Sequence, residues 1–199
     1  MTMNKNILLC GVGGQGTVLA SKLLAAAAME KNIPVMSAET IGMAQKGGSV
    51  FSHLRMGEDI MTPMLGKGSA DVIIGFEPAE AVRMLPYLGS DGCVIVNKCP
   101  VIPVSSVLQK SSYDGTEMTE YLKQQVKDLV IVDGSAVCRE VGSPKVLNMV
   151  LLGAALESGV LPFTSEEIKS VMQKKVKPQF YELNCLALDY GARSGKVGN

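Results

Sequence analysis

A glycine-rich segment near the start of the chain has residue types and spacing that suit an anionic ligand. Residues 11–16 read GVGGQG and satisfy the pattern G-x-G-x-x-G. In this pattern Gly11 allows a tight turn, Gly13 allows a ligand to approach closely, and Gly16 allows a helix to pack on a strand. A helix that begins near Thr17 would point free N–H groups at a phosphate. The segment predicts either a phosphate or nucleotide-like ligand or, without any ligand, close contact with another backbone.

Two further residues bear on whether such a ligand is a dinucleotide. We expect Glu39 to end the second strand, about where an acid would bind the ribose of NAD(P). Gln15, however, places a bulky hydrogen-bonding side chain inside the first loop. A second glycine-rich loop also replaces the helix expected between the second and third strands. A free-standing NAD(P)-binding Rossmann-type oxidoreductase is therefore kept as an alternative hypothesis.

The second glycine-rich segment, AETIGMAQKGGSVFSHLR at residues 38–55, is the less common feature. It combines several hydrogen-bond donors with one acid, which suits contact with an anionic ligand or with the polar surface of a partner. A solvated hairpin loop is the simpler alternative. The candidate ligand-binding residues are Gly11, Gly13, Gly14, Gln15 and Gly16 in the first segment, and Glu39, Gly42, Gln45, Lys46, Gly47 and Gly48 in the second.

Side chains that commonly carry catalysis or bind metals are sparse. His53 is the only histidine, and we expect it to be a hydrogen-bonded strand residue whose free side faces a partner. Asp133 ends an expected strand, where it either caps the next element or lines a ligand crevice. The cysteines show no C-x-x-C spacing, so we expect no zinc ribbon or iron–sulfur cluster from this chain alone, and buried thiols at positions 10, 93, 99, 138 and 185. We assign no catalytic residue and no metal ligand.

Composition limits the class of protein and of partner. The chain has 199 residues, of which 47% are hydrophobic, enough for one substantial core. Its 19 basic residues balance 19 acidic ones, so no global field draws it to nucleic acid or to an acidic membrane face. No stretch is typical of a signal peptide or of a membrane-spanning segment. We expect a cytoplasmic protein with a small-molecule or protein partner.

Short apolar runs alternate with helical patterns, which predicts an α/β fold. We expect a Rossmann-like three-layer arrangement, with a mostly parallel sheet, helices on both faces, and an inserted glycine-loop and hairpin segment whose turn is MGED. The expected strands are 6–10, 33–38, 49–56, 70–76, 92–98 and 129–133. The expected helices are 17–31, 77–88, 115–128, 143–159 and 165–176, the last with Ser165 as its N-cap, and a further short helix follows residue 177.

Three segments together resemble one family of proteins. GVGGQGTVLASKLLAAAA, SAETIGMAQKGGSVFSHLRMG and ADVIIGFEPAEAVRMLPYL are similar to the gamma-type subunits of 2-oxoacid:ferredoxin oxidoreductases. Two glycine motifs at this mutual spacing, joined by GMAQ and followed by a SHLR strand, are much more specific than either motif alone. Among these subunits the chain looks most similar to the beta subunit of indolepyruvate ferredoxin oxidoreductase. The resemblance implies that residues 1–199 form a single pyruvate/ketoisovalerate ferredoxin oxidoreductase gamma-type domain.

The resemblance also implies an activity. The chain would be the non-cluster subunit of a complex that oxidatively decarboxylates a 2-oxoacid, indolepyruvate or another aryl pyruvate, with coenzyme A. The products would be an acyl-CoA, carbon dioxide and reduced ferredoxin. Thiamine diphosphate and the iron–sulfur clusters would belong to a larger catalytic partner subunit in a hetero-oligomer. The isolated chain would be inactive and would hold no tightly bound cofactor, with coenzyme A as a co-substrate.

By the same resemblance, the glycine residues of both loops would contact coenzyme A or the partner subunit. There is one departure: Lys46 stands before the paired glycines, where the family often has arginine. Lysine keeps the charge but loses the planar fork of the guanidinium group, so its grip on a phosphate or carboxylate would be looser. A non-catalytic assembly module, in which the glycine loops serve only packing and association, is a second alternative.

Overall fold

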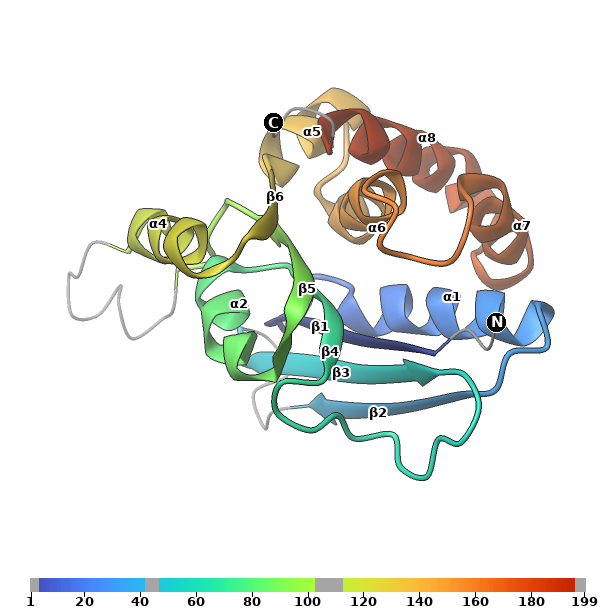
Figure 1. Cartoon of the computed structure of the whole chain (residues 1–199). Coiled ribbons are helices and arrows are strands. Elements are labelled where there is room, and N and C mark those ends of the chain that lie inside the picture. Colours follow the sequence, from blue (N-terminus) through green and yellow to red (C-terminus); the bar gives the residue numbers. More distant parts are fainter. Residues whose placement is uncertain (1–3, 42–46, 103–112, 196–199) are drawn as a thin grey trace.

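The computed structural model describes residues 4–41, 47–102 and 113–195 (Figure 1). Its centre is a six-stranded sheet in the order β2-β3-β1-β4-β5-β6. β3 runs antiparallel to both of its neighbours, and the other neighbouring strands are parallel, so the predicted α/β fold with a mostly parallel sheet is confirmed. The strands are β1 Lys5–Val12, β2 Val35–Ile41, β3 Ser49–Met56, β4 Ala70–Gly75, β5 Leu88–Asn97 and β6 Asp128–Val132.

Helices follow most of the strands. The α-helices are α1 Thr17–Glu30, α2 Pro78–Met84, α4 Thr116–Gln125, α5 Gly134–Val141, α6 Leu147–Glu157, α7 Ser165–Lys175 and α8 Pro178–Ser194. Two 3-10 turns, η1 Leu85–Tyr87 and η2 Pro144–Val146, adjoin α2 and α6. Within the described ranges, no helix combines the length and the apolar character needed to cross a membrane.

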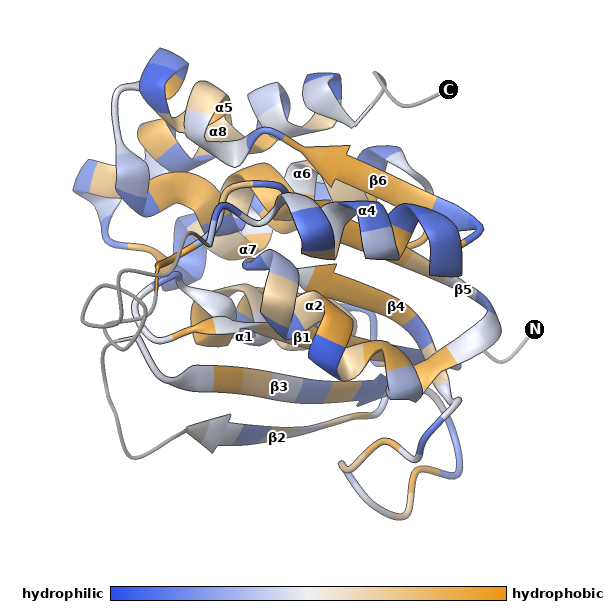
Figure 2. Ribbon diagram, turned by 90° about the vertical axis from the view of Figure 1, so that its left-hand side faces the viewer, coloured by the Kyte–Doolittle hydropathy of each residue, from blue (hydrophilic) through white to orange (hydrophobic). Residues whose placement is uncertain are grey.

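The strands β1, β4 and β5 are buried between two apolar layers. Ile7 and Leu9 of β1 join the layer that α1, α5, α6, α7 and α8 complete, whereas Leu8 and Cys10 join the layer that α2 and α4 complete. Figure 1 shows these helices on opposite sides of the strands, and Figure 2 shows the apolar residues that fill β4 and β6. Strands covered on both faces need such continuous apolar runs.

The hairpin lies earlier in the chain than predicted. β2 and β3 are adjacent and antiparallel, so the second glycine-rich segment closes this hairpin. The MGED turn follows β3, but the next strand, β4, pairs with β1 on the side away from β3. The prediction of MGED as a hairpin turn is therefore wrong, because a local turn signal does not determine which strand will lie alongside.

Three further differences from the predictions concern helices. Thr164, not Ser165, is the N-cap of α7, where a capping box joins it to Glu167. The final helix, α8, has 17 residues and is not short. α5 follows Asp133 directly and was not predicted, because its eight residues span only about two turns, too few for their apolar periodicity to be recognised.

Candidate functional site

The two glycine-rich segments meet where β1 ends. The N–H of Gly13 donates to the carbonyl of Gly48 at 2.8 Å, and the N–H of Gly47 donates to the carbonyl of Gly13 at 3.4 Å. The parallel strands β4, β5 and β6 end at the same side of the sheet. We call this side, with the residues that follow β1, β4, β5 and β6, the carboxyl edge. In open α/β sheets, ligands bind at this edge.

Gln15 directs its amide into the protein. Its Oε1 accepts from the N–H of Val12 at 2.8 Å, and its Nε2 donates to the carbonyl of Phe76 at 2.9 Å, so it joins the ends of β1 and β4. A side chain at Gly11 would place its Cβ only 2.6 Å from Gln15 Oε1 and 2.7 Å from Phe76 Cβ. Gly11 therefore makes room for this amide. The amide of Gln15 therefore occupies the space between the ends of β1 and β4.

The rest of the first loop divides into an exposed and a packed part. Gly14 is exposed, has a φ of 102°, and has open space where a Cβ would stand. Gly16 has a φ of 87° and is the N-cap of α1, and a Cβ there would lie 2.8 Å from Asn148 Nδ2 of α6. Thr17 is buried at the first position of α1, which lacks a side-chain cap. The exposed backbone at Gly14 and the first turn of α1 could thus bind an anion, whereas Gly16 serves packing.

Glu39 is not brought to the first loop. β2 continues to Ile41, so Glu39 lies inside the strand and the prediction that it ends the strand is wrong. It pairs with Ser52 of β3, and β3 separates it from β1. Two strand spacings amount to about 10 Å. The dinucleotide hypothesis needs its acid on the strand next to β1, and the topology places Glu39 one strand farther away. Gly42, Gln45 and Lys46 lie outside the described residues.

Two buried acids at the carboxyl edge were missed from the sequence. Glu77 is 3% exposed and Glu80 6% exposed at the start of α2, where Glu77 is the N-cap. The hydroxyl of Tyr113 donates to Glu77 Oε1 at 2.6 Å, and that of Ser49 donates to Glu80 Oε2 at 2.5 Å. Burial and then the Glu77 carboxylate raise the pKa of Tyr113. The spacing E-x-x-E after a strand could have indicated a cap, but not the two hydroxyl partners.

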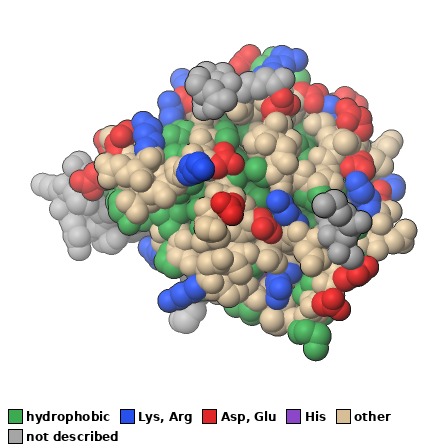
Figure 3. Space-filling model, viewed as in Figure 1, with side chains coloured by type: hydrophobic (Ala, Val, Ile, Leu, Met, Phe, Trp, Pro, Cys, Tyr) green, Lys and Arg blue, Asp and Glu red, His purple; other side chains and the backbone are tan. Residues whose placement is uncertain are grey.

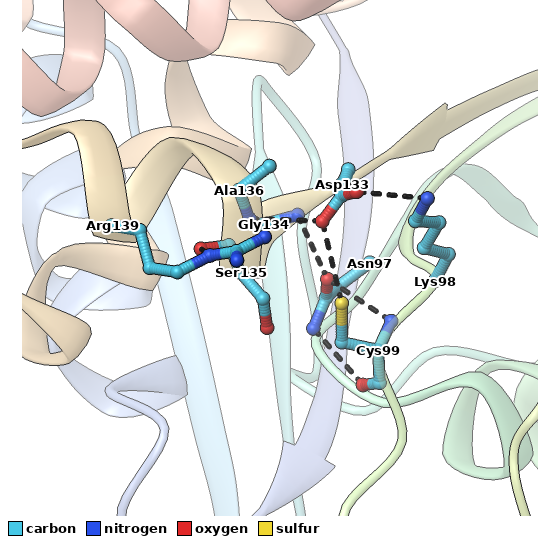
Figure 4. A network of polar contacts seen from close by, with 8 residues as sticks. All are labelled: Asn97, Lys98, Cys99, Asp133, Gly134, Ser135, Ala136 and Arg139. Carbon is cyan, nitrogen blue, oxygen red and sulfur yellow. Dashed lines mark hydrogen bonds and ion pairs between the residues drawn. The ribbon is translucent and has the colours of Figure 1, made fainter.

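A second polar network follows β5 and β6 (Figure 4). Asp133 Oδ1 accepts from the N–H of Ala136 at 2.9 Å, so this residue caps α5, which is one of the two roles predicted for it. Lys98 Nζ lies 2.8 Å from Asp133 Oδ2, and this lysine lowers the pKa of the carboxyl group. Asn97 accepts from the N–H of Gly134 at 3.1 Å and donates to the carbonyl of Phe76 at 3.1 Å. The network therefore fixes the ends of β4, β5 and β6 relative to one another.

A hollow of about 570 Å³ lies beside α5. It is lined by Ser135, Cys138, Arg139, Gly142, Ser143 and Pro144. Arg139 is exposed there and donates from Nε to the carbonyl of Ser135 at 3.4 Å. On the face shown in Figure 3, basic and acidic side chains are interspersed, in keeping with the balanced charge of the chain.

His53 belongs to the interior and not to a surface. Its Nδ1 accepts from the N–H of Leu65 at 3.2 Å, which confirms a hydrogen-bonded strand residue. The residue is 0% exposed, and its ring packs edge-on against Phe51 and Tyr87 at centroid distances of 5.5 and 5.7 Å. The expectation that it faces a partner is therefore wrong. Burial lowers its pKa.

The cysteines are less uniformly buried than predicted. Cys10, Cys93 and Cys138 are buried, but Cys99 and Cys185 are partly exposed. Burial is the main cause that raises the pKa of Cys93, to about 12. Over residues 4–41, 47–102 and 113–195, no group of three His, Cys, Asp or Glu residues could hold a metal ion.

Comparison with known proteins identifies the family of the chain. The sequence pattern of the family described as pyruvate ferredoxin/flavodoxin oxidoreductase matches residues 6–194. Indolepyruvate oxidoreductase subunit IorB of Pyrococcus horikoshii is 34% identical over 96% of both chains. The protein of the same name from Archaeoglobus fulgidus is 36% identical over 95% of this chain and 94% of its own.

Solved structures share the fold at lower identity. The gamma subunit of a keto/oxoacid ferredoxin oxidoreductase from Geobacter sulfurreducens has a TM-score of 0.68 at 20% identity and covers 98% of this chain and 99% of its own. The 2-oxoglutarate:ferredoxin oxidoreductase of Magnetococcus marinus has a TM-score of 0.72 at 18% identity, and there the match spans 98% of this chain but 32% of the longer one. The chain therefore belongs to the pyruvate ferredoxin/flavodoxin oxidoreductase family, as a gamma-type subunit of a 2-oxoacid:ferredoxin oxidoreductase.

Proposed function

We propose that the chain is the gamma-type subunit of an indolepyruvate or other aryl pyruvate:ferredoxin oxidoreductase. The complex would convert the 2-oxoacid and coenzyme A to an acyl-CoA and carbon dioxide, and would reduce ferredoxin. The observation that carries this proposal is an identity of 34–36%, over nearly the whole of both chains, to proteins named indolepyruvate oxidoreductase subunit IorB. The isolated chain would be inactive.

The proposal assigns thiamine diphosphate and the iron–sulfur clusters to a larger partner subunit. An iron–sulfur cluster needs several thiolates together, and the described part of this chain offers no group of three potential ligands. The described residues therefore do not fit a cluster, which supports assigning the electron-transfer steps to the partner subunit. The same proposal makes residues 1–199 a single, Rossmann-like and cytoplasmic domain within a hetero-oligomer.

Coenzyme A is an anionic co-substrate, and the carboxyl edge offers one place that suits its phosphates. The backbone at Gly14 is exposed, and the first turn of α1 has no side-chain cap that would compete for its N–H groups. Gly47 and Gly48 lie beside Gly13 and extend this surface. Lys46, which precedes Gly47 in the sequence and carries a positive charge, lies outside the described residues. We propose that this surface contacts coenzyme A in the assembled complex.

A second function is supported by a different observation. Gln15 is hydrogen-bonded to the chain's own backbone, and Gly16 packs against Asn148, so much of the first loop serves internal packing. The loops would then stabilise the fold and the assembly without touching the co-substrate. This hypothesis makes the subunit an assembly module within the same complex.

One experiment separates both of these hypotheses from a free-standing NAD(P)-binding oxidoreductase. The chain is affinity-purified anaerobically from its native cells, and the eluate is assayed for reduction of a viologen dye by indolepyruvate plus coenzyme A. We expect a large, brown partner to co-purify with activity that depends on coenzyme A. A colourless chain that elutes alone and binds NAD(P) would overturn the proposed function.

A matched pair of variants then tests the ligand surface. Gly14 and Gly142 are both exposed, have φ values of 102° and 84°, and have open space at the Cβ position. Alanine at either position strains the backbone to a similar extent, by about 1–2 kcal/mol. We expect Gly14→Ala to raise the KM for coenzyme A severalfold at unchanged assembly, and Gly142→Ala to leave it unchanged. Equal KM values in both variants would favour the assembly module.

A further inference from the structure

β2 is an open edge of the sheet. It is the first strand in the order, and it pairs on one side only, with β3. Figures 1 and 2 both show β2 as the outermost strand at its end of the sheet. Among the described residues, no other strand pairs with its outward N–H and carbonyl groups. Unpaired backbone groups of this kind are a template for another strand.

The opposite edge is protected, whereas β2 is not. β6 has five residues, begins with Asp128, and follows the exposed Lys127. Shortness and charge are the usual devices that prevent one sheet edge from pairing with another. β2 has seven residues, of which only Glu39 is charged, and it contains no proline. Met36 is 40% exposed, although it lies within the strand. This edge therefore retains the features that permit pairing.

We propose that β2 pairs antiparallel with β2 of a second copy of this chain, about a twofold axis at Ala38. Seven residues centred on Ala38 place that alanine opposite its own equivalent. Ser37 then lies opposite Glu39 of the second copy, and Met36 lies opposite Thr40 of the second copy. A twofold axis repeats each of these contacts, so the surface is complementary to itself.

The polar side chains of the strand are complementary to those of a second copy. In this register the Glu39 carboxylate lies beside the Ser37 hydroxyl of the other copy, which can donate a hydrogen bond to it. The two Glu39 side chains are only diagonal neighbours, so no like charges stand directly opposite one another. Two small alanine side chains at the axis let the strands approach without steric conflict.

The arrangement directs the carboxyl edges of the two copies away from each other. β2 is parallel to β1, because each is antiparallel to β3. Antiparallel pairing of two β2 strands therefore turns the carboxyl edges of the two copies toward opposite ends of the joined sheet. Each copy could still receive its own catalytic partner subunit. The inference rests on the geometry of β2 and not on the proposed function.

Cross-linking tests the predicted register. Opposed residues of an antiparallel pair have Cβ atoms about 4.5–5.5 Å apart, close to what a disulfide requires. Ala38→Cys in the full chain, treated with a mild oxidant, should give a covalent dimer. Thr40→Cys is the matched control, because the two Thr40 positions lie about 13 Å apart along the strands. No dimer from Ala38→Cys, or equal dimer from both variants, would overturn the proposal.

Charge substitution at Ser37 provides an independent test, with the dimer dissociation constant of the full chain measured by analytical ultracentrifugation. Ser37→Glu places like charges opposite Glu39 twice and should raise the dissociation constant about tenfold. Ser37→Lys places opposite charges there and should lower it. Both changes are at an exposed residue, so folding, followed by circular dichroism, should not change. The same shift from both variants, or none from either, contradicts the pairing.

Discussion

Gly14 at the carboxyl edge and the glycines between α6 and α8 serve opposite purposes. At the edge, Gly14 is exposed and has open space around it, so glycine there provides a backbone conformation. In the helical layer, a Cβ at Gly153 would lie 2.0 Å from the carbonyl oxygen of Leu188, and one at Gly191 would lie 2.0 Å from that of Val150. Because glycine has no Cβ, the backbones of α6 and α8 come into direct contact there. Hydrogen bonds hold the carboxyl edge together, whereas close packing holds α6 and α8 together.

The largest expected effect tests the packed region. Gly153→Ala forces a methyl group into the backbone of α8, so the helices must separate, and we expect a loss of about 3 kcal/mol or a failure to fold. Urea denaturation followed by circular dichroism measures the loss. Gly142→Ala, which meets only backbone strain, should cost about 1 kcal/mol. Equal losses would show that packing between α6 and α8 is looser than the structure indicates.

A smaller effect is expected from the polar bonds of the edge. Gln15→Ala removes both hydrogen bonds that join β1 and β4, and leaves the N–H of Val12 without its side-chain acceptor. We expect a loss of about 2 kcal/mol in the free energy of unfolding. Gln124→Ala, at an exposed site on α4, is the control and should change stability by less than about 0.5 kcal/mol. A neutral Gln15→Ala would mean that the amide does not hold the edge together.

The pH dependence of stability tests the buried His53 beside β1. Because burial lowers its pKa from 6.5, the unfolded chain takes up a proton more readily than the folded one. The contribution of His53 to the free energy of unfolding is fully present above pH 6.5. It falls as the pH decreases below that value, by at most about 1.4 kcal/mol per pH unit. Thermal unfolding between pH 5 and 7.5 measures the slope. The carboxyl of Asp133, with its lowered pKa, affects stability only at lower pH, below its ordinary value of 3.8.

A control variant isolates the histidine in that experiment. His53→Asn keeps an acceptor for the N–H of Leu65 and removes the titrating ring. We expect it to flatten the dependence on pH in this range, whatever its effect on stability at pH 7.5. An unchanged slope would assign the dependence to another group.

The smallest effect concerns the N-cap of α7. Thr164→Ala removes the hydroxyl that accepts from the N–H of Glu167 and should cost about 1 kcal/mol. Ser165→Ala, one residue later, lies inside the helix and should be close to neutral. Urea denaturation of both variants measures the difference. A larger loss in Ser165→Ala would restore the N-cap predicted from the sequence.

Local patterns were enough to locate most elements but not their neighbours. Apolar runs identified all six strands, and among the described residues the element after the second strand is a strand at 49–56, as predicted. The pairing of β3 between β2 and β1 was not evident, and the MGED turn was misinterpreted for this reason. Turn chemistry depends on a few adjacent residues, whereas strand order depends on contacts between residues far apart in sequence.

The sequence by itself determined that two glycine-rich segments flank a strand and that the chain is α/β, because glycine spacing and apolar periodicity are local properties. Only the tertiary structure decided that Gly13 meets Gly48, that Gln15 turns inward, and that Glu77 and Glu80 are buried beside Tyr113 and Ser49. Those outcomes depend on which strand ends come together, and that is set by burial of β1, β4 and β5 between the two helical layers.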